Sequence, residues 1–314
     1  LHLFQLGNII MASSDFRPDS RLFPFESRFW ESSRGRIHYI DEGEGDPILF
    51  LHGNPTWSFL YRGIVIRLRK SCRCMALDLP GFGLSDHPPD YRYTPEEHAR
   101  LVRGFVEHLD LQNLTIMGHD WGGPIGMRVA VDEVKRISGL VMGNTWYWPT
   151  TALHLRAFSW IMSTGYVRRW IHKKNLFVDK MIPLGVKHPL APEVLQHYQG
   201  PFPTVDSRAG VAEFARQISR SANWLAQLET DVRRTLRSTP LLLTWGMDDL
   251  AFTPAFMDTF LRDFDKSSVV RLDAKHFIQE AYNSAAKAKH FIKEDTPGEV
   301  SEAIRAFRQN PSHA

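Results

Sequence analysis

The residues best suited to chemistry lie in the stretch Leu114-Thr-Ile-Met-Gly-His-Asp-Trp-Gly-Gly123. An apolar run ends at Gly118, and a helical pattern from Gly122 to Val134 follows. This pattern predicts a nucleophile elbow with Asp120 at its tip, in which the two glycines keep side chains out of a strained turn. A carboxylate at this place can attack carbon and form an ester. An acidic cap on an ordinary helix is the simpler explanation.

Three further motifs end predicted strands and could act together with the elbow. The loop His52-Gly-Asn-Pro-Thr-Trp57 can aim a backbone N–H into an oxyanion hole. Trp245-Gly-Met-Asp-Asp249 supplies acids able to orient a histidine, and Val269-Val-Arg-Leu-Asp-Ala-Lys-His276 supplies that histidine. A single Asp or His is usually structural. Four motifs at strand ends, in the order nucleophile, acid, histidine, predict the active site of an α/β hydrolase.

Alternating strands and helices from Phe23 onward must position these motifs. Such alternation predicts an α/β fold with a mostly parallel sheet covered by helices on both faces. The clearest helix begins at Thr94, with Pro95 in its first turn and Glu97 closing a capping box. The predicted strands are 27–31 and 35–42 (an antiparallel opening pair), 47–52, 74–79, 114–117, 137–142, 241–245 and 269–272. The other predicted helices are 122–134, 254–262 and 299–307.

A helix-like interruption separates the strands 137–142 and 241–245. Its place predicts a helical cap over the carboxyl ends of the strands, where open α/β sheets bind ligands. The predicted division is an N-terminal extension (1–22), a first core part (23–147), the cap (148–230) and a second core part (231–314). Among the aromatic residues of the cap, we expect most of the following in its own core and a minority in a pocket: Phe158, Trp160, Tyr166, Trp170 and Phe177.

Composition limits the classes of function. With a net charge of +3 and 23% charged residues, nothing in the chain calls for a nucleic-acid partner, and the basic run 168–174 reads as the solvated face of a helix. No apolar run is long enough to cross a membrane, so no membrane partner is expected. Cys72 and Cys74 are too close in sequence to bridge readily, which favours a reducing compartment and hence the cytoplasm.

The N-terminus is predicted to start naturally at Met11, with residues 1–10 arising from a start-site artefact. The alternative is that this mildly apolar segment forms an ordered arm used in self-association.

Over about residues 23 to 308 the chain resembles the haloalkane dehalogenases. The resemblance rests on His52-Gly-Asn-Pro-Thr-Trp57, Asp78-Leu-Pro-Gly-Phe-Gly-Leu-Ser-Asp86, Gly118-His-Asp-Trp-Gly-Gly123 and Trp245-Gly-Met-Asp-Asp-Leu-Ala-Phe252. It implies Asp120 as nucleophile, His276 as base and Asp249 as acid, with Asn54 and Trp121 binding the departing halide. The family's other place for the acid reads Gly143-Asn144 here, so the pattern is similar to the subfamily with an Asp–His–Asp triad. Asp248 is the neighbouring alternative to Asp249.

The implied reaction needs neither a metal nor an organic cofactor. Asp120 would displace halide from an sp³ carbon of a small halogenated alkane, and His276 would activate water to hydrolyse the resulting ester. Backbone N–H groups of Asn54 and Trp121 would hold the oxyanion. The expected products are an alcohol, a proton and a chloride or bromide ion.

A short duplication leaves the histidine open. Lys275-His-Phe-Ile-Gln-Glu280 recurs fourteen residues later as Lys289-His-Phe-Ile-Lys-Glu294. His276 keeps the strand in front of it and is preferred, whereas residues 285–289 in front of His290 read as helix. If strand pairing used the second copy, the roles would exchange.

Two rival functions use the same fold. An epoxide hydrolase also has an aspartate nucleophile but needs proton-donating tyrosines, for which Tyr147, Tyr166 and Tyr198 are available. Asn54 beside Trp121 favours a halide instead. A non-catalytic ligand receptor is the remoter alternative, because the chain carries a complete set of nucleophile, acid and histidine.

Overall fold

The computed structural model describes residues 16–88, 90–280 and 296–309. Within these ranges one eight-stranded sheet has the order β1-β2-β4-β3-β5-β6-β7-β8. The β1–β2 pair is antiparallel, as the sequence predicted. The β2–β4 pair is antiparallel as well, which the sequence did not predict, and the other neighbouring pairs are parallel, as expected of a mostly parallel sheet. The strands are β1 (Arg28–Ser32), β2 (Gly35–Glu42), β3 (Pro47–Leu51), β4 (Arg73–Leu77), β5 (Leu114–His119), β6 (Ile137–Gly143), β7 (Leu241–Gly246) and β8 (Ser267–Leu272).

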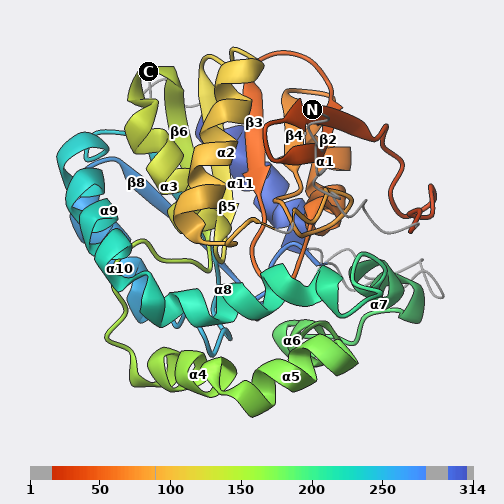
Figure 1. The fold of residues 1–314 in the computed structure, drawn as a ribbon. Coiled ribbons are helices and arrows are strands. Elements are labelled where there is room, and N and C mark those ends of the chain that lie inside the picture. The colour runs from red at the N-terminus through yellow and green to blue at the C-terminus, as the bar shows by residue number, and fades with distance from the viewer. Residues whose placement is uncertain (1–15, 89, 281–295, 310–314) are drawn as a thin grey trace, which may run out of the picture.

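Helices cover both faces of this sheet. Figure 1 shows α2 and α3 in front of it and α11 behind it, with α4 to α8 forming a separate layer across one end. The helices of the sheet layers are α1 (Arg62–Leu68), α2 (Pro95–His108), α3 (Gly122–Asp132), α9 (Ala222–Thr235), α10 (Ala255–Asp263) and α11 (Thr296–Gln309). The end layer contains α4 (Leu153–Ser163), α5 (Gly165–Lys174), α6 (Leu176–Gly185), α7 (Pro192–Gln199) and α8 (Ala209–Arg220). Short 3₁₀ turns are η1 (Ser58–Tyr61), η2 (Val134–Arg136) and η3 (Asp206–Arg208).

The central strands β3 and β5 are buried at every residue. Parallel strands covered on both faces have no solvent side, so they read as continuous apolar runs rather than as an alternating pattern. Their carboxyl ends meet at one edge of the sheet, next to the layer formed by α4 to α8. That edge is where the predicted motifs come together.

The start of α2 differs from its prediction in one bond. The Thr94 hydroxyl accepts from the backbone N–H of Glu97, as expected of an N-cap. The Glu97 carboxylate instead accepts from the backbone N–H and the guanidinium of Arg92. The reciprocal half of the capping box is therefore absent, because an arginine two residues before the cap offers a charged donor as well as a backbone one.

The expectation that most of the five aromatic residues pack in the core of the cap is wrong. Phe158 and Phe177 line a cavity, in keeping with a minority in the pocket, but Trp160, Tyr166 and Trp170 are exposed rather than packed in a cap core. α9 also runs through the predicted cap boundary between residues 230 and 231. The domain division itself stays a prediction.

No helix in the described ranges is long and apolar enough to cross a membrane. The cysteines Cys72 and Cys74 are buried and unbridged, with their sulfur atoms 4.0 Å apart.

Candidate active site

The turn between β5 and α3 holds Asp120 with a positive φ of 51°. Residues other than glycine rarely adopt this backbone conformation, so contacts with the surrounding residues must hold Asp120 in it. The turn lies so close to the end of β3 that a Cβ on Gly122 would be 1.9 Å from the Leu51 carbonyl oxygen. A Cβ on Gly53 would be 2.2 Å from Asp120 Oδ1. Glycine is thus needed on both sides of the carboxylate.

Two backbone donors hold one side of the Asp120 carboxylate. The N–H of Asn54 donates to Oδ1 over 2.7 Å, and the N–H of Trp121 donates to the same carboxylate. Burial raises the pKa of Asp120 above its ordinary value, and the two N–H groups together with the charge of His276 offset only part of that rise. Asp120 is therefore a carboxylate with little solvent around it, which makes it a stronger nucleophile than one in water.

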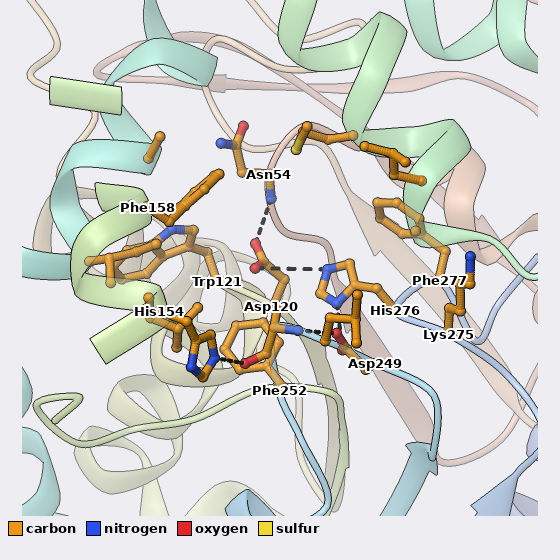
Figure 2. Close-up of a pocket in the computed structure, with 18 of the residues that line it drawn as sticks. Asn54, Asp120, Trp121, His154, Phe158, Asp249, Phe252, Lys275, His276 and Phe277 are labelled. Atoms are coloured by element: carbon orange, nitrogen blue, oxygen red, sulfur yellow. Dashed lines mark hydrogen bonds and ion pairs between the residues drawn. The ribbon is translucent and has the colours of Figure 1, made fainter. Parts of the chain in front are cut away.

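A histidine and a second acid complete the arrangement, as Figure 2 shows. His276 Nε2 lies 4.0 Å from Asp120 Oδ2, and His276 Nδ1 lies 2.9 Å from Asp249 Oδ2. Burial alone would lower the pKa of His276, but the charge and hydrogen bond of Asp249 and the charge of Asp120 outweigh it and raise that pKa. Burial alone would raise the pKa of Asp249, but His276, Ala251 N–H and the Asn144 amide outweigh it and lower the pKa to about 2.

The sequence offered two other candidates, Asp248 for the acid and His290 for the histidine. Asp248 also lines the cavity, but its carboxylate lies 3.4 Å from Lys187 Nζ, whereas Asp249 is the acid bonded to His276. His290 lies outside the described residues. Asp249 is thus the acid that the structure brings to His276.

Asn144 is a site residue that the sequence did not reveal. Its amide donates to Asp249 Oδ2 over 2.8 Å, and its Oδ1 accepts from Gly246 N–H over 2.8 Å. It therefore joins the ends of β6 and β7 and orients the acid. The only signal in the sequence was its place, at the strand end where an acid was sought and not found.

His119 is a second such residue, directly before Asp120. Its ring centroid lies 4.5 Å from that of His276, and its Nε2 donates to the His276 carbonyl oxygen over 2.8 Å. Burial lowers the pKa of His119 well below its ordinary value, so it is neutral, and its proton sits on Nε2 because a carbonyl can only accept. The end of β5 thereby supports the backbone of the loop after β8, residues 273–280, which carries His276.

Glu280 anchors that loop at its other end. Its two carboxylate oxygens accept from the Arg62 guanidinium over 2.6 and 2.8 Å, and Tyr198 of α7 also donates to it. A bidentate pair of this kind fixes geometry as well as charge. The loop that carries His276 is tied by Glu280 both to the core and to the cap.

The side-chain donors Asn54 Nδ2 and Trp121 Nε1 both face the cap helix α8. Asn54 Nδ2 donates to the Val211 carbonyl over 3.1 Å, and Trp121 Nε1 donates to the Phe214 carbonyl over 3.2 Å. Asn54 Oδ1 is buried and has no partner among the described residues. An anion held by these two N–H groups must share them with α8 or displace its carbonyls.

A cavity of about 360 Å³ opens above these groups. Asn54, Asp120 and His276 form its polar floor, and its walls are mainly apolar. The cap supplies Phe158, Phe177, Met181 and Ile218 to these walls, and the loop that follows β7 supplies Phe252. The space suits a small apolar molecule whose reactive carbon reaches Asp120.

The tyrosines that an epoxide hydrolase would need are elsewhere. Tyr147 donates to Asp263 over 2.7 Å, Tyr198 donates to Glu280, and Tyr166 is exposed. Within the described ranges no tyrosine lines the cavity. This geometry disfavours epoxide opening.

Comparisons with known proteins agree with this geometry. The α/β hydrolase fold family matches residues 46–281. Haloalkane dehalogenase 2 of Mycobacterium tuberculosis is 48% identical over 295 residues, which cover 93% of this chain and 98% of that protein. The cis-3-alkyl-4-alkyloxetan-2-one decarboxylase of Shewanella oneidensis is 32% identical over 91% of this chain and 89% of that protein. The crystal structure of the haloalkane dehalogenase DatA from Agrobacterium tumefaciens C58 superposes with a TM-score of 0.79 at 27% identity, covering 92% of this chain and 98% of DatA.

Proposed function

The chain belongs to the haloalkane dehalogenase family of α/β hydrolases, and on that premise we propose that Asp120, His276 and Asp249 carry out its reaction. The protein is a hydrolase that converts haloalkanes to an alcohol, a halide ion and a proton. The observation that supports the assignment of residues is the place of Asp120, between two backbone donors and a histidine at the floor of an apolar cavity.

The first step is displacement of halide. Asp120 Oδ2 attacks the halogen-bearing carbon, the carbon–halogen bond breaks with its electron pair on the halide, and an alkyl ester of Asp120 remains. Asp120 Oδ1 stays with the N–H of Asn54 and becomes the ester carbonyl oxygen. Hydrogen bonds from Asn54 Nδ2 and Trp121 Nε1 stabilise the halide where water is excluded.

The second step is hydrolysis of the ester. His276 takes a proton from water, the oxygen of that water attacks Cγ of Asp120, and the backbone N–H groups of Asn54 and Trp121 hold the oxyanion. Collapse releases the alcohol and restores the carboxylate. Asp249 holds the tautomer of His276 and stabilises its protonated form. The proton then leaves to solvent.

The direct test is release of halide and protons from short bromo- and chloroalkanes, followed by ion chromatography and a pH indicator. We expect one halide and one proton per alcohol. Absence of halide release across the panel would contradict the assignment.

A second candidate rests on the 32% identical decarboxylase. The same panel should therefore contain a cis-3-alkyl-4-alkyloxetan-2-one. Release of carbon dioxide from it, without halide release from any haloalkane, would favour that activity.

Loss of the Trp121 N–H should slow displacement. Trp121→Phe is expected to lower kcat/KM for halide release by about 10²-fold or more, because one of two donors to the halide is lost. It should also raise the inhibition constant for bromide. Trp146→Phe is the matched control. The indole N–H of Trp146 has no partner among the described residues, and the ring centroids of Trp146 and Trp121 lie 4.7 Å apart. Equal losses in both variants would assign the effect to packing.

Acidic pH should stop turnover before it stops halide release. Asp249 and Asp120 raise the pKa of His276, so His276 becomes protonated as pH falls through that value and cannot take a proton from water. Displacement requires only that Asp120 is ionised. Rapid-quench measurements are expected to show an acidic window with a burst of one halide per enzyme and little turnover. Burst and turnover that decline together would exclude His276 as the base of the second step.

The cysteines and the proposed reaction also point to a location and to small-molecule partners. We place the enzyme in the cytoplasm because Cys72 and Cys74 are unbridged, although their sulfur atoms lie only 4.0 Å apart. Its small-molecule partners are the haloalkane and the chloride or bromide released from it.

A further inference from the structure

The cap helices α4 and α5 expose several large apolar side chains to solvent. Leu153 and Trp160 on α4 are 79% and 71% exposed, and Tyr166 on α5 is 72% exposed. Ile161 and Trp170 are also exposed. Single exposed apolar residues are normal, but a gathered set of this size marks an interaction surface.

These side chains form two stripes rather than a scatter. Leu153, Trp160 and Ile161 recur on α4 at spacings that place them on one helix face. On α5, Tyr166 and Trp170 are one turn apart, and their ring centroids lie 6.1 Å from each other. We call the exposed surface of residues 153–174 the α4–α5 face.

The charge on this face is of one sign. α4 and α5 contain Arg156, Arg168, Arg169, Lys173 and Lys174 but no Asp or Glu. Arg168 is turned inward toward Glu213, with 3.9 Å between the charged groups. The other four are exposed, and none forms an ion pair with a described residue. The basic groups lie in and beside the apolar stripes, so both kinds of side chain would meet the same partner.

The α4–α5 face lies at the outer end of the molecule. Figure 1 shows α4 and α5 on the side of the α4-to-α8 layer that is farthest from the sheet, with α8 between them and the sheet. α4 also contributes to the cavity, because His154, Leu155 and Phe158 line it. The exposed Leu184 and Leu250 line the same cavity and mark where it opens to solvent. The face and the cavity therefore share a helix.

We propose that the α4–α5 face docks on the surface of a bilayer that contains anionic phospholipids. Trp and Tyr prefer the boundary between lipid and water, and Lys and Arg beside them can reach the phosphates. Helices with such side chains lie in the interface plane, and each basic group adds attraction to anionic lipid. This replaces the expectation of no membrane partner: the sequence showed a basic run, whereas the structure shows that the aromatic residues beside it are exposed.

A second copy of the chain is the competing occupant of this face. A two-fold contact through the α4–α5 face would set the four exposed cations of one copy opposite those of the other, with no acid on either helix to separate them. Like charges across an interface are unfavourable. An anionic lipid surface has the complementary charge.

Docking would bring the cavity to its substrate. Haloalkanes are apolar and concentrate in bilayers, so a cavity that opens beside a docked face takes them up where they are abundant. This consequence rests on the proposed function. The docking itself requires no catalysis. It is tested by binding alone, so its failure is distinguishable from a failure of the enzymatic assignment.

The first test is co-sedimentation of the full chain with phosphatidylcholine vesicles, with and without phosphatidylglycerol. We expect binding only with phosphatidylglycerol, weakening as salt rises. The triple variant Arg169→Gln, Lys173→Gln, Lys174→Gln should bind about 100-fold more weakly, at about fivefold per charge. The matched control removes three exposed charges outside the cap, by Lys135→Gln, Lys266→Gln and Arg271→Gln. It should bind within about threefold of wild type.

The second test asks whether the aromatic residues meet lipid. Nitroxide-labelled phospholipid should quench part of the tryptophan fluorescence, and Trp160→Phe with Trp170→Phe should remove that quenched part. Absence of phosphatidylglycerol-dependent binding, or equal losses in the two charge triples, would overturn the proposal. The proposal would also be overturned if the protein binds no vesicles but self-associates, and if Trp160→Ser with Trp170→Ser abolishes that self-association. The α4–α5 face would then contact a second copy of the chain.

Discussion

Replacing Asp120 with asparagine is expected to lower halide release by roughly 10⁴-fold or more. The amide cannot attack carbon, so no ester forms and no halide is displaced. The shape of the side chain and its bond from the Asn54 N–H can persist, because the amide oxygen also accepts. Halide release under single-turnover conditions, together with intact mass spectrometry, measures the effect. No alkyl adduct should appear.

This loss should occur without loss of stability. Burial raises the pKa of Asp120, which means that folding buries its charge at a cost. The neutral asparagine avoids that cost, so the thermal midpoint should stay the same or rise. Asp132→Asn, on the exposed side of α3, is the matched control and should release halide at the wild-type rate. Halide release by Asp120→Asn near that rate would exclude Asp120 as the nucleophile.

Replacing His276 with glutamine is expected to trap the reaction halfway. Displacement needs Asp120 and the halide donors, so one halide per enzyme should still appear. Hydrolysis then lacks its base and should slow by about 10³-fold or more, which leaves an alkyl ester on Asp120. Mass spectrometry should show one alkyl group per chain, and peptide mapping should place it on Asp120.

The duplicated segment supplies the control for this experiment. His290→Gln removes the same side chain from the second copy of the motif and should turn over at the wild-type rate, without an adduct. If His290→Gln accumulates the ester and His276→Gln does not, the two histidines exchange roles. Asp249→Asn should slow hydrolysis in the same direction as His276→Gln, whereas Asp248→Asn should not, because Asp248 faces Lys187.

Local patterns were enough to predict most of the fold. The elbow at Asp120, the buried strands β3 and β5 and the N-cap at Thr94 depend on residues a few positions apart, and such signals are present in a single sequence. The order of the motifs also sufficed to predict that Asp120, Asp249 and His276 meet, because the carboxyl ends of parallel strands lie at one edge of a sheet.

Only the tertiary structure decided how those residues are held. Asn144 reaches Asp249 across 105 positions of sequence, and His119 reaches the His276 carbonyl across 157. Trp121 and Asn54 meet carbonyls of a helix that the sequence placed only as part of a cap. The exposure of Trp160 and Tyr166 was likewise invisible, since helical periodicity identifies a face but not what covers it. Long-range bonds and coverage depend on how elements pack, and packing is a property of the whole chain.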